Sequence, residues 1–286
     1  MLFNHSLNGV EFSAYSPSTN GDGVITYTVS SDYIGAATST CRVLLPSGPS
    51  NVNHRVIIAL PVELDPQTNY GSGLDCLRTN NAQNAYNATI VEPQFGNLTW
   101  CADNPLNTDY RHETFIIIGL VPWIRTNFSG ANDPISLIGF SKSGFGAMNL
   151  ILRYPTMFTR AACWDFPVDM VGYNQYEGST AAYGSQGNFN ANYKLSTARL
   201  NAARVPFLGQ EKLWFSANRC IWDEETLTYC STLSSLGILY TLDDPNSLIG
   251  RTHWWLGGWV PIAAQWLGTD IPLPSQRLGR WIRTTP

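Results

Sequence analysis

Short runs of alternating apolar and polar residues open the chain, and each run ends near a turn-forming residue such as Ser or Pro. Residues 10–17, 25–31 and 39–46 have this pattern, which is typical of antiparallel strands that expose one face. From residue 55 onward the apolar runs become almost continuous, and helical stretches separate them. Such runs are typical of parallel strands buried on both faces. The pattern therefore predicts an antiparallel edge joined to a parallel sheet.

Strands and helices are expected to alternate through the rest of the chain. The strand-like runs are residues 55–61, 88–93, 135–140, 159–165, 212–218 and 238–244. The helical stretches are residues 112–124, 143–154, 223–237 and 259–268. This order predicts one α/β domain over residues 1–286, with a mostly parallel sheet of about eight strands between helices. A polar segment rich in Gly and Asn, residues 166–207, interrupts the alternation, and we expect it to form a lid or lobe over the strand ends.

Composition and charge argue against some classes of binding partner and favour others. The 286 residues carry a formal net charge of −4, and Lys and Arg form no cluster along the sequence, so we expect no binding to nucleic acid or anionic lipid. No run approaches the roughly 18 apolar residues that a membrane-spanning helix needs. The 10 Trp, 13 Tyr and 12 Phe residues exceed the usual needs of a core of this size. Some of these rings are therefore expected to line a substrate cleft.

Cysteines and glycosylation signals favour an extracellular protein. Four N-x-[ST] signals and six cysteines in loop-rich surroundings predict a secreted glycoprotein. The cysteine spacing fits no zinc or redox motif, and the chain has only four His, so we expect no metal site. We expect disulfides between Cys76 and Cys101 and between Cys220 and Cys230, because each pair brackets a loop-rich segment, and a buried thiol at Cys163. The glycosylation signals begin at Asn4, Asn87, Asn97 and Asn127.

The strongest chemical signal is a Ser at a strand-to-helix corner. The predicted strand 135–140 runs directly into Ser141-Lys142-Ser143-Gly144 and a helix rich in small residues. In a nucleophile elbow the turn is tight, the Ser is strained, and small neighbours let the helix approach the strand. Ser141 is therefore the expected nucleophile, although Ser143 replaces the last Gly of the motif G-x-S-x-G. A Ser that merely caps the helix is the simpler alternative.

Three segments carry a family resemblance: GFSKSGFGAMNLILRYP, RAACWD and THWWLGGWVPIAAQWL. Together they resemble esterases of the α/β-hydrolase superfamily related to esterase D and feruloyl esterases, which carry G-H-S-x-G-G-x-G-A at the elbow and H-x-W before a terminal helix. The resemblance implies an α/β-hydrolase fold, with Ser141 as nucleophile and His253 as general base. In this chain Phe140 replaces the usual His, and Lys142-Ser143 replaces x-Gly, as in a sub-branch with S-K-S-G elbows.

The order of the residues along the chain also supports His253 as the base, and it leaves two candidates for the acid. Of the four His, only His253 follows the last predicted strand, where this fold places its base. The acid must orient the imidazole and stabilise its protonated form, so it should follow the strand 212–218 or the preceding strand. Asp223 is the first choice and Asp165 is the alternative. An acidic first turn that complements a helix dipole is the other role open to Asp223.

Two backbone amides are needed to stabilise the negative oxygen that develops during ester cleavage. One is expected from Lys142, and the other from Val62 or Glu63 in the loop after the strand 55–61, which lacks the H-G-G sequence of many relatives. By resemblance, the loop 94–105 approaches the cleft, although Trp100 in it would serve equally as an aromatic plug. The residues expected to line the substrate site are Trp100, Trp164 and Trp254.

These features predict a carboxylic-ester hydrolase that works through an acyl-enzyme without metal or organic cofactor. The expected substrate is a small-molecule ester or an ester linked to a polysaccharide. Among enzymes, the alternative is an acyltransferase or a peptidase with the same triad. In an acyltransferase another alcohol takes the place of water, and in a peptidase a peptide takes the place of the ester. A noncatalytic protein that keeps the fold and binds a ligand in its aromatic cleft is the alternative outside enzymes.

Overall fold

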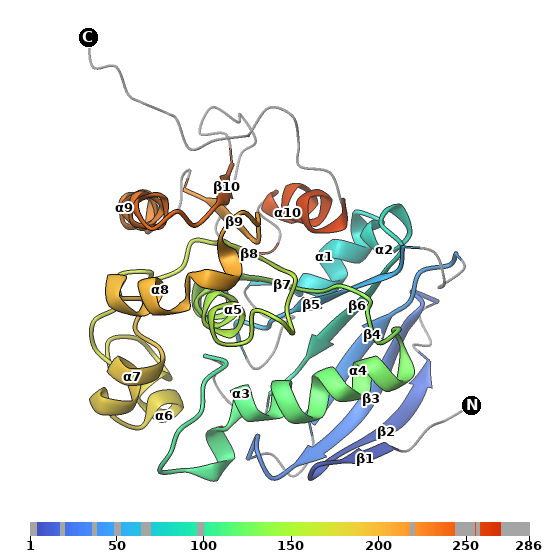
Figure 1. Ribbon diagram of the computed structural model, residues 1–286. Helices are drawn as coiled ribbons and strands as arrows, with labels where there is room; N and C mark the ends of the chain where they lie inside the picture. The colour runs from blue at the N-terminus through green and yellow to red at the C-terminus, as the bar shows by residue number, and fades with distance from the viewer. Residues whose placement is uncertain are drawn as a thin grey trace.

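The computed structural model describes residues 5–17, 21–35, 39–48, 53–63, 70–95, 100–217, 221–243, 255 and 258–269 (Figure 1). Within this part of the chain, ten strands form one sheet in the order β1-β2-β3-β4-β6-β5-β7-β8-β9-β10. Their bounds are β1 (His5–Leu7), β2 (Val10–Pro17), β3 (Val24–Ser31), β4 (Ser39–Leu44), β5 (Arg55–Ala59), β6 (Ala88–Pro93), β7 (Ile135–Phe140), β8 (Arg160–Trp164), β9 (Leu213–Ser216) and β10 (Tyr240–Leu242).

The sheet has an antiparallel part and a parallel part. The strands β1 to β4 pair antiparallel with one another, and β4 pairs antiparallel with β6. The strands β6, β5, β7, β8, β9 and β10 are parallel. The antiparallel edge and the parallel sheet expected from the sequence are therefore confirmed, and the three-residue strand β1 is an addition.

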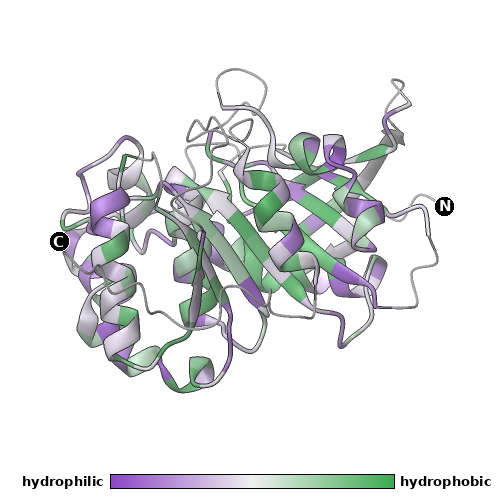
Figure 2. Ribbon diagram, turned by 90° about the horizontal axis from the view of Figure 1, so that it is seen from above, coloured by the Kyte–Doolittle hydropathy of each residue, from purple (hydrophilic) through white to green (hydrophobic). Residues whose placement is uncertain are grey.

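Helices cover both faces of the sheet, and each face has its own apolar core. The helix bounds are α1 (Gly73–Thr79), α2 (Ala82–Ala85), η1 (Thr108–Tyr110), α3 (His112–Thr114), the π-helical η2 (Phe115–Leu120), α4 (Val121–Asn127), α5 (Ser141–Arg153), α6 (Ser179–Tyr183), α7 (Gln186–Asn192), α8 (Thr197–Ala203), η3 (Val205–Phe207), α9 (Asp223–Ser235) and α10 (Trp259–Gly268). Val56 and Ile58 of β5 belong to the core shared with α4, α5 and α9, whereas Ile57 and Ala59 belong to the core shared with α1, α2 and α10. Figure 2 shows the resulting hydrophobic central strands. Burial on both faces explains why these strands appear in the sequence as continuous apolar runs.

Residues 166–207 connect β8 to β9 and contain three short helices, α6, α7 and α8. Figure 1 shows these helices together beside α5. Phe189 of α7 stacks with Phe145 of α5, with ring centroids 6.4 Å apart, and Leu200 of α8 belongs to the same core. The segment therefore packs on the core of the domain and is called the lobe below; its role as a lid or separate lobe stays a prediction.

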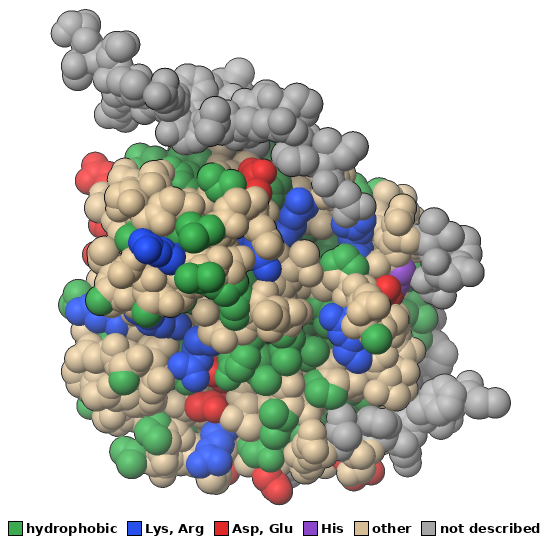
Figure 3. Space-filling model, viewed as in Figure 1, with side chains coloured by type: hydrophobic (Ala, Val, Ile, Leu, Met, Phe, Trp, Pro, Cys, Tyr) green, Lys and Arg blue, Asp and Glu red, His purple; other side chains and the backbone are tan. Residues whose placement is uncertain are grey.

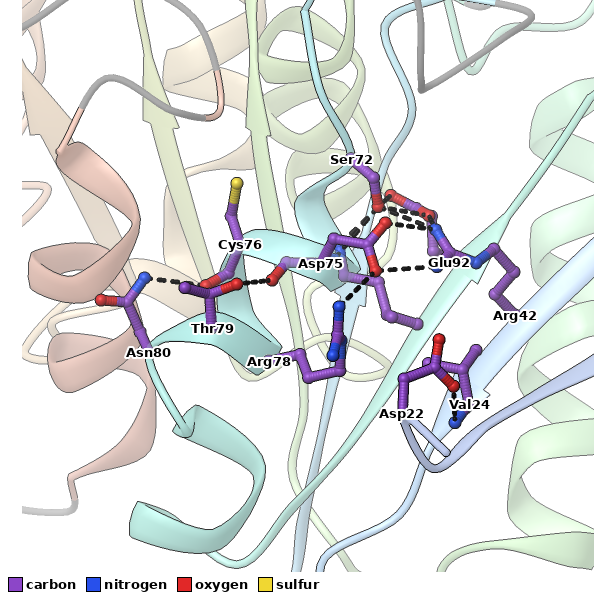
Figure 4. A network of polar contacts seen from close by, with 11 residues as sticks. Asp22, Val24, Arg42, Ser72, Asp75, Cys76, Arg78, Thr79, Asn80 and Glu92 are labelled. Atoms are coloured by element: carbon purple, nitrogen blue, oxygen red, sulfur yellow. Dashed lines mark hydrogen bonds and ion pairs between the residues drawn. The ribbon is translucent and has the colours of Figure 1, made fainter. Parts of the chain in front are cut away.

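A polar network fixes the start of α1 against the antiparallel part of the sheet (Figure 4). The guanidinium of Arg42 in β4 lies 2.8 Å from Asp75 Oδ1 and 3.0 Å from Glu92 Oε2. The hydroxyl of Ser72 accepts a hydrogen bond from the Asp75 N–H and donates to Glu92. Burial raises the pKa of Glu92 against the opposing effect of Arg42, whereas in half-buried Asp75 the effect of burial is outweighed by Arg42, which holds its pKa below the usual value. The network joins β4, β6 and α1.

The predicted disulfide between Cys76 and Cys101 is wrong. Both cysteines are free and buried, and they belong to different cores, so the sheet lies between them. Cys230 is also free and buried in α9, which contradicts its predicted disulfide; the proposed partner, Cys220, lies outside the described residues. Cys163 is the expected buried thiol, and burial raises its pKa. Spacing along the sequence says nothing of the sheet face on which a cysteine lies, and this is why the pairing failed.

The surface of the described residues provides little further evidence on the predicted binding partners. Lys and Arg side chains occupy several separate places on the face in Figure 3. Within the described residues no helix has the length and apolar character needed to cross a bilayer. The glycoprotein prediction has no support: Thr89, which completes the signal at Asn87, is buried in β6 with 1% of its surface exposed. The signals at Asn4 and Asn97 begin outside the described residues.

Candidate active site

Ser141 lies where β7 ends and α5 begins, and its backbone is strained. Its φ is 52°, in the left-handed region that residues with a side chain rarely adopt. The Ser141 N–H donates to the carbonyl of Asp165, 2.9 Å away, which holds the turn against the end of β8. This is the backbone conformation that a nucleophile elbow requires.

Glycines allow α5 to approach its neighbours closely. A Cβ on Gly139 would lie 2.6 Å from the backbone carbon and oxygen of Ser143. A Cβ on Gly146 would lie 2.8 Å from the Cβ of Cys101. Separations this short are far inside van der Waals contact, so a side chain at either position would push α5 away from β7 or from the loop around Cys101.

Ser143, which replaces the last Gly of the elbow motif, binds the residue before the nucleophile. Its hydroxyl donates to the carbonyl of Phe140 at 2.9 Å and accepts from the N–H of Phe140 at 3.1 Å. The side chain of Ser143 is fully buried, so both bonds are shielded from water. Glycine would leave these two backbone groups without the hydroxyl, and the departure from the motif therefore adds a tether to the turn.

A pocket of about 230 Å³ opens at Ser141, and one of its walls is aromatic. The rings of Trp100 and Tyr176 stack with centroids 6.1 Å apart, and Tyr176 meets Trp222 edge-on at 5.9 Å. The indole N–H of Trp100 donates to the carbonyl of Glu177 at 3.0 Å, which joins this wall to the lobe. The pocket is lined by Val62, Glu63, Tyr70, Trp100, Phe140, Ser141, Lys142, Asp165, Pro167, Tyr176, Glu177, Ile221 and Trp222.

Among the described lining residues, one cation faces three carboxylates. The Nζ of Lys142 lies 2.5 Å from Oε1 of Glu63. The Oδ1 of Asp165 accepts a hydrogen bond from the N–H of Ile221 at 2.6 Å, and Glu177 is exposed. The excess of negative charge in this part of the pocket disfavours an anionic substrate.

The two predicted acids lie at the carboxyl ends of neighbouring strands. Asp165 follows β8, is fully buried and has a φ of 44°. Asp223 follows β9 as the first residue of α9 and is half-buried. Because β7, β8 and β9 are adjacent and parallel, both acids share the sheet edge of Ser141. The hydrogen bond from Ile221 to Asp165 joins the two loops two residues before Asp223.

Among the described side chains, neither His54 nor His112 lines the pocket. His54 precedes β5, and its Nδ1 lies 2.7 Å from Oδ2 of Asp133, which precedes β7; this pair is at the amino ends of the strands, opposite the elbow. His112 is fully buried, and burial lowers its pKa to about 3. His5 lies in the outermost strand, β1.

The predicted base and one predicted wall residue, His253 and Trp254, lie outside the described residues.

Trp255 and Trp164 pack beneath the elbow. The ring of Trp255 meets Phe140 edge-on at 5.3 Å and Trp164 at 5.4 Å, and its backbone N–H donates to the carbonyl of Tyr70. Trp164 has 0% of its surface exposed and does not line the pocket. Its position is that of a core residue rather than of the expected substrate contact.

Tyr176 and Trp222 are residues of the aromatic wall that were not predicted from the sequence. Each of them stands directly before an acidic residue, Glu177 and Asp223 respectively. An aromatic ring beside a charged residue in a polar segment was the available signal, because a ring that packs only in the core usually has apolar neighbours.

Comparison with known proteins identifies the family. Residues 38–229, more than half of the chain, match the family described as "Putative esterase". Two curated proteins of Mycobacterium tuberculosis strains, Esterase Rv1288 and Esterase MT1326, are each 34% identical to this chain over 86 residues. The match covers 28% of this chain and spans only 19% of the length of either relative.

Solved structures show the fold. An S-formylglutathione hydrolase from Agrobacterium tumefaciens superposes with a TM-score of 0.66 at 12% identity, over 89% of this chain and 98% of that one. FphF, a fluorophosphonate-binding serine hydrolase of Staphylococcus aureus, superposes with a TM-score of 0.62 at 15% identity, over 86% of this chain and 98% of that one. The expected α/β-hydrolase fold and the resemblance to esterases are confirmed. The chain belongs to the esterase family that its residues 38–229 match.

Proposed function

We propose that this chain is a serine carboxylic-ester hydrolase with Ser141 as its nucleophile. The observation that carries the proposal is the strained Ser141 backbone at the edge of an aromatic-walled pocket. Membership of an esterase family supports the same reaction. The fold is shared with FphF, a fluorophosphonate-binding serine hydrolase, and this supports a serine nucleophile here.

His253 is the proposed general base. Of the His with described side chains, His54 lies at the amino ends of the strands and His112 lies in the core, and neither lines the pocket. Trp255, two residues after His253, packs against Phe140, the residue before Ser141. A base carried by the segment just before Trp255 is therefore well placed in the chain to serve Ser141.

Asp223 is the proposed acid, and Asp165 is the alternative. Asp223 follows β9 on the sheet edge of Ser141 and is half-buried. Asp165 has structural duties: its carbonyl accepts from the Ser141 N–H, and its carboxylate accepts from the Ile221 N–H. One N–H occupies only part of the accepting capacity of a carboxylate, so Asp165 stays an alternative. Asp223 is preferred because its place between β9 and α9 matches the usual position of the triad acid.

The proposed reaction proceeds in two halves. His253 takes the proton from Ser141 Oγ as this oxygen attacks the ester carbonyl, and the amides of Lys142 and of Val62 or Glu63 stabilise the negative oxygen that forms. Protonated His253 then gives its proton to the leaving alcohol, and the acyl group stays on Ser141. Water attacks this acyl-enzyme with His253 again as base, and the acid product leaves as Ser141 regains its proton.

The pocket favours an ester of limited size that carries no negative charge. Its volume of about 230 Å³ is below the roughly 300–1,000 Å³ typical of sites for drug-sized ligands. We therefore propose a small ester, or an ester group that projects from a larger molecule such as a polysaccharide. The wall formed by Trp100, Tyr176 and Trp222 would cover an apolar or planar part of such a group.

Labelling with a fluorophosphonate probe tests the proposal, because only an activated Ser reacts. The unaltered protein should be labelled and should hydrolyse at least one member of a p-nitrophenyl ester series of increasing chain length. Ser141→Ala should abolish labelling and lower kcat by several orders of magnitude, roughly 10⁶-fold where the triad acts as a unit. Ser231→Ala, on the exposed surface of α9, is the control and should behave like the unaltered protein. Labelling that persists in Ser141→Ala would contradict the assignment.

A further inference from the structure

The segments that carry the proposed oxyanion donors are joined by their side chains. Lys142 directly follows the nucleophile, and Glu63 lies in the loop after β5, 79 residues earlier in the chain. Their charged groups meet at 2.5 Å between Nζ and Oε1. The hydrolytic mechanism uses the backbone amides at these positions and assigns no task to the ion pair.

The ion pair is shielded enough for its two charges to depend on each other. The side chain of Lys142 is 10% exposed and that of Glu63 is 25% exposed. A shielded ammonium left alone is strongly unfavourable, and removal of one partner of such a pair costs far more than removal of an exposed one. Lys142 is also the only cation among the described lining residues. Glu63 is therefore held where Lys142 places it.

The geometry transmits this restraint to the loop after β5. Lys142 belongs to the first turn of the 13-residue helix α5, which packs against both β7 and β8, so its backbone is a rigid anchor. On the other side, the Leu60 N–H donates to the carbonyl of Ile138 in β7 at 3.0 Å. Glu63, three residues later, is bound to Lys142. Val62 and Glu63 thus lie between a backbone tether to β7 and a side-chain tether to α5.

We infer that Lys142 and Glu63 form a positioning pair, which fixes the amides of Val62 and Glu63 relative to the elbow. The inference rests on the proposed function, since it assigns a task within ester hydrolysis. Donors to the oxyanion act only within about 2.7–3.1 Å of the oxygen, so a displacement of the loop by a few tenths of an ångström weakens them. In this role the two side chains act through the loop, although both lie in the lining of the pocket.

A positioning role and a substrate-contact role affect kinetics differently. A displaced oxyanion donor weakens binding of the transition state but not of the substrate, so kcat falls while KM stays nearly constant. A side chain that binds the substrate directly would raise KM instead. Deletion of a donor costs roughly 10²- to 10³-fold in kcat. A donor that stays but is misplaced should cost less, roughly 10- to 100-fold.

The experiment compares Glu63→Gln, Lys142→Met and the double variant in the intact chain. Each single substitution should lower kcat for a p-nitrophenyl ester by about 10- to 100-fold with KM within about threefold of the unaltered value. The double variant should be no worse than the worse single variant, because both substitutions remove one interaction. Affinity for phenylboronic acid, which forms a tetrahedral adduct with an active Ser, should fall in parallel with kcat.

Matched controls separate this effect from the loss of any charge. Lys212→Met removes an ammonium bound to the carbonyl of Pro155, at the amino end of β9, and Glu11→Gln changes an exposed carboxylate of β2. Both should leave kcat unchanged. Unchanged kcat in Glu63→Gln, or a raised KM at constant kcat, would overturn the positioning role. If Lys142→Met does not fold, Glu63→Gln alone decides. An unaltered protein that neither reacts with fluorophosphonate nor hydrolyses esters would instead refute the proposed function.

Discussion

The elbow around Ser141 and the lobe between β8 and β9 are held in place by different kinds of contact. At the elbow, most of the residues that decide the geometry are neighbours in the sequence: Gly139 and Ser143 stand two positions from Ser141, and the carbonyl of Asp165 adds a bond from β8. At the lobe, they come from distant parts of the chain. Glu113 of α3 accepts hydrogen bonds from Arg153 of α5 at 2.7 Å and from Tyr193, just after α7, at 2.9 Å.

Further contacts at this junction have the same long-range character. The Asp103 N–H donates to the Tyr193 hydroxyl at 2.9 Å, and the Asn104 side chain donates to the carbonyl of Ala181 at 2.7 Å. Arg199 of α8 binds Asn149 of α5. A local backbone requirement can be recognised in a short motif, whereas the docking of the lobe relies on pairs such as these three, which lie 50 to 90 residues apart in the sequence.

The first prediction, with the largest effect expected in this comparison, distinguishes Asp223 from Asp165 as the acid of the triad. Asp223→Asn should lower kcat by about 10⁴-fold if Asp223 orients the base, the loss seen when a triad Asp is changed to its amide. Asp165→Asn should cost much less, because its carbonyl to Ser141 is unchanged and an amide oxygen still accepts from the Ile221 N–H. Steady-state hydrolysis of a p-nitrophenyl ester measures both, with unfolding midpoints to show that the variants are folded. If Asp165→Asn lowered kcat more than Asp223→Asn, Asp165 would be the acid of the triad.

The second prediction addresses the lobe. Glu113→Ala removes a carboxylate that is 2% exposed and leaves the guanidinium of Arg153, which is 30% exposed, without its partner. Loss of one member of a buried pair costs about 3–5 kcal/mol, and the partial exposure of Arg153 points to the lower end of this range. Denaturant titration should show the loss. KM should also rise, because the lobe contributes Tyr176 to the pocket wall.

The second prediction has a control variant and an outcome that would contradict it. Glu11→Ala, on the exposed surface of β2, should change the free energy of unfolding by less than about 0.5 kcal/mol. If Glu113→Ala were as stable as Glu11→Ala and kept the same KM, the lobe would be held by its apolar contacts alone. The contrast between a locally fixed elbow and a lobe docked through polar contacts would then fail.

Much of the fold could be predicted because burial on both faces makes parallel strands apolar throughout. The expected ranges 88–93, 135–140 and 259–268 coincide with β6, β7 and α10. In contrast, α1 and α2 were missed, since they lie in a segment dominated by Asn and other polar residues and begin at caps such as Ser72 rather than at an apolar repeat. Short helices of this kind form mainly through tertiary contacts.

The candidate site was predicted to an unequal degree. The elbow was found because the strand, Ser141 and the small residues that follow it form one contiguous signal. The aromatic wall was found only at Trp100, since Tyr176 and Trp222 come from two other segments. The ion pair between Lys142 and Glu63 joins positions 79 residues apart, and the sequence analysis considered only their backbone amides. Side-chain partners across loops depend on the fold and not on spacing.

The smallest expected effect tests whether the elbow is as locally determined as the comparison implies. Ser143→Ala removes the hydroxyl that binds the N–H and the carbonyl of Phe140 in a fully buried turn. A buried N–H without its partner costs about 1–3 kcal/mol, and a small packing adjustment places the expected loss of stability near the lower end. Thermal unfolding measures this loss against Ser231→Ala, whose hydroxyl is on an exposed helix surface. Fluorophosphonate labelling of Ser141 should persist in Ser143→Ala, because Gly139 and the bond to Asp165 still impose the turn. Loss of labelling with little loss of stability would mean that the Ser143 hydroxyl, rather than the close approach at Gly139, holds Ser141 in its strained conformation.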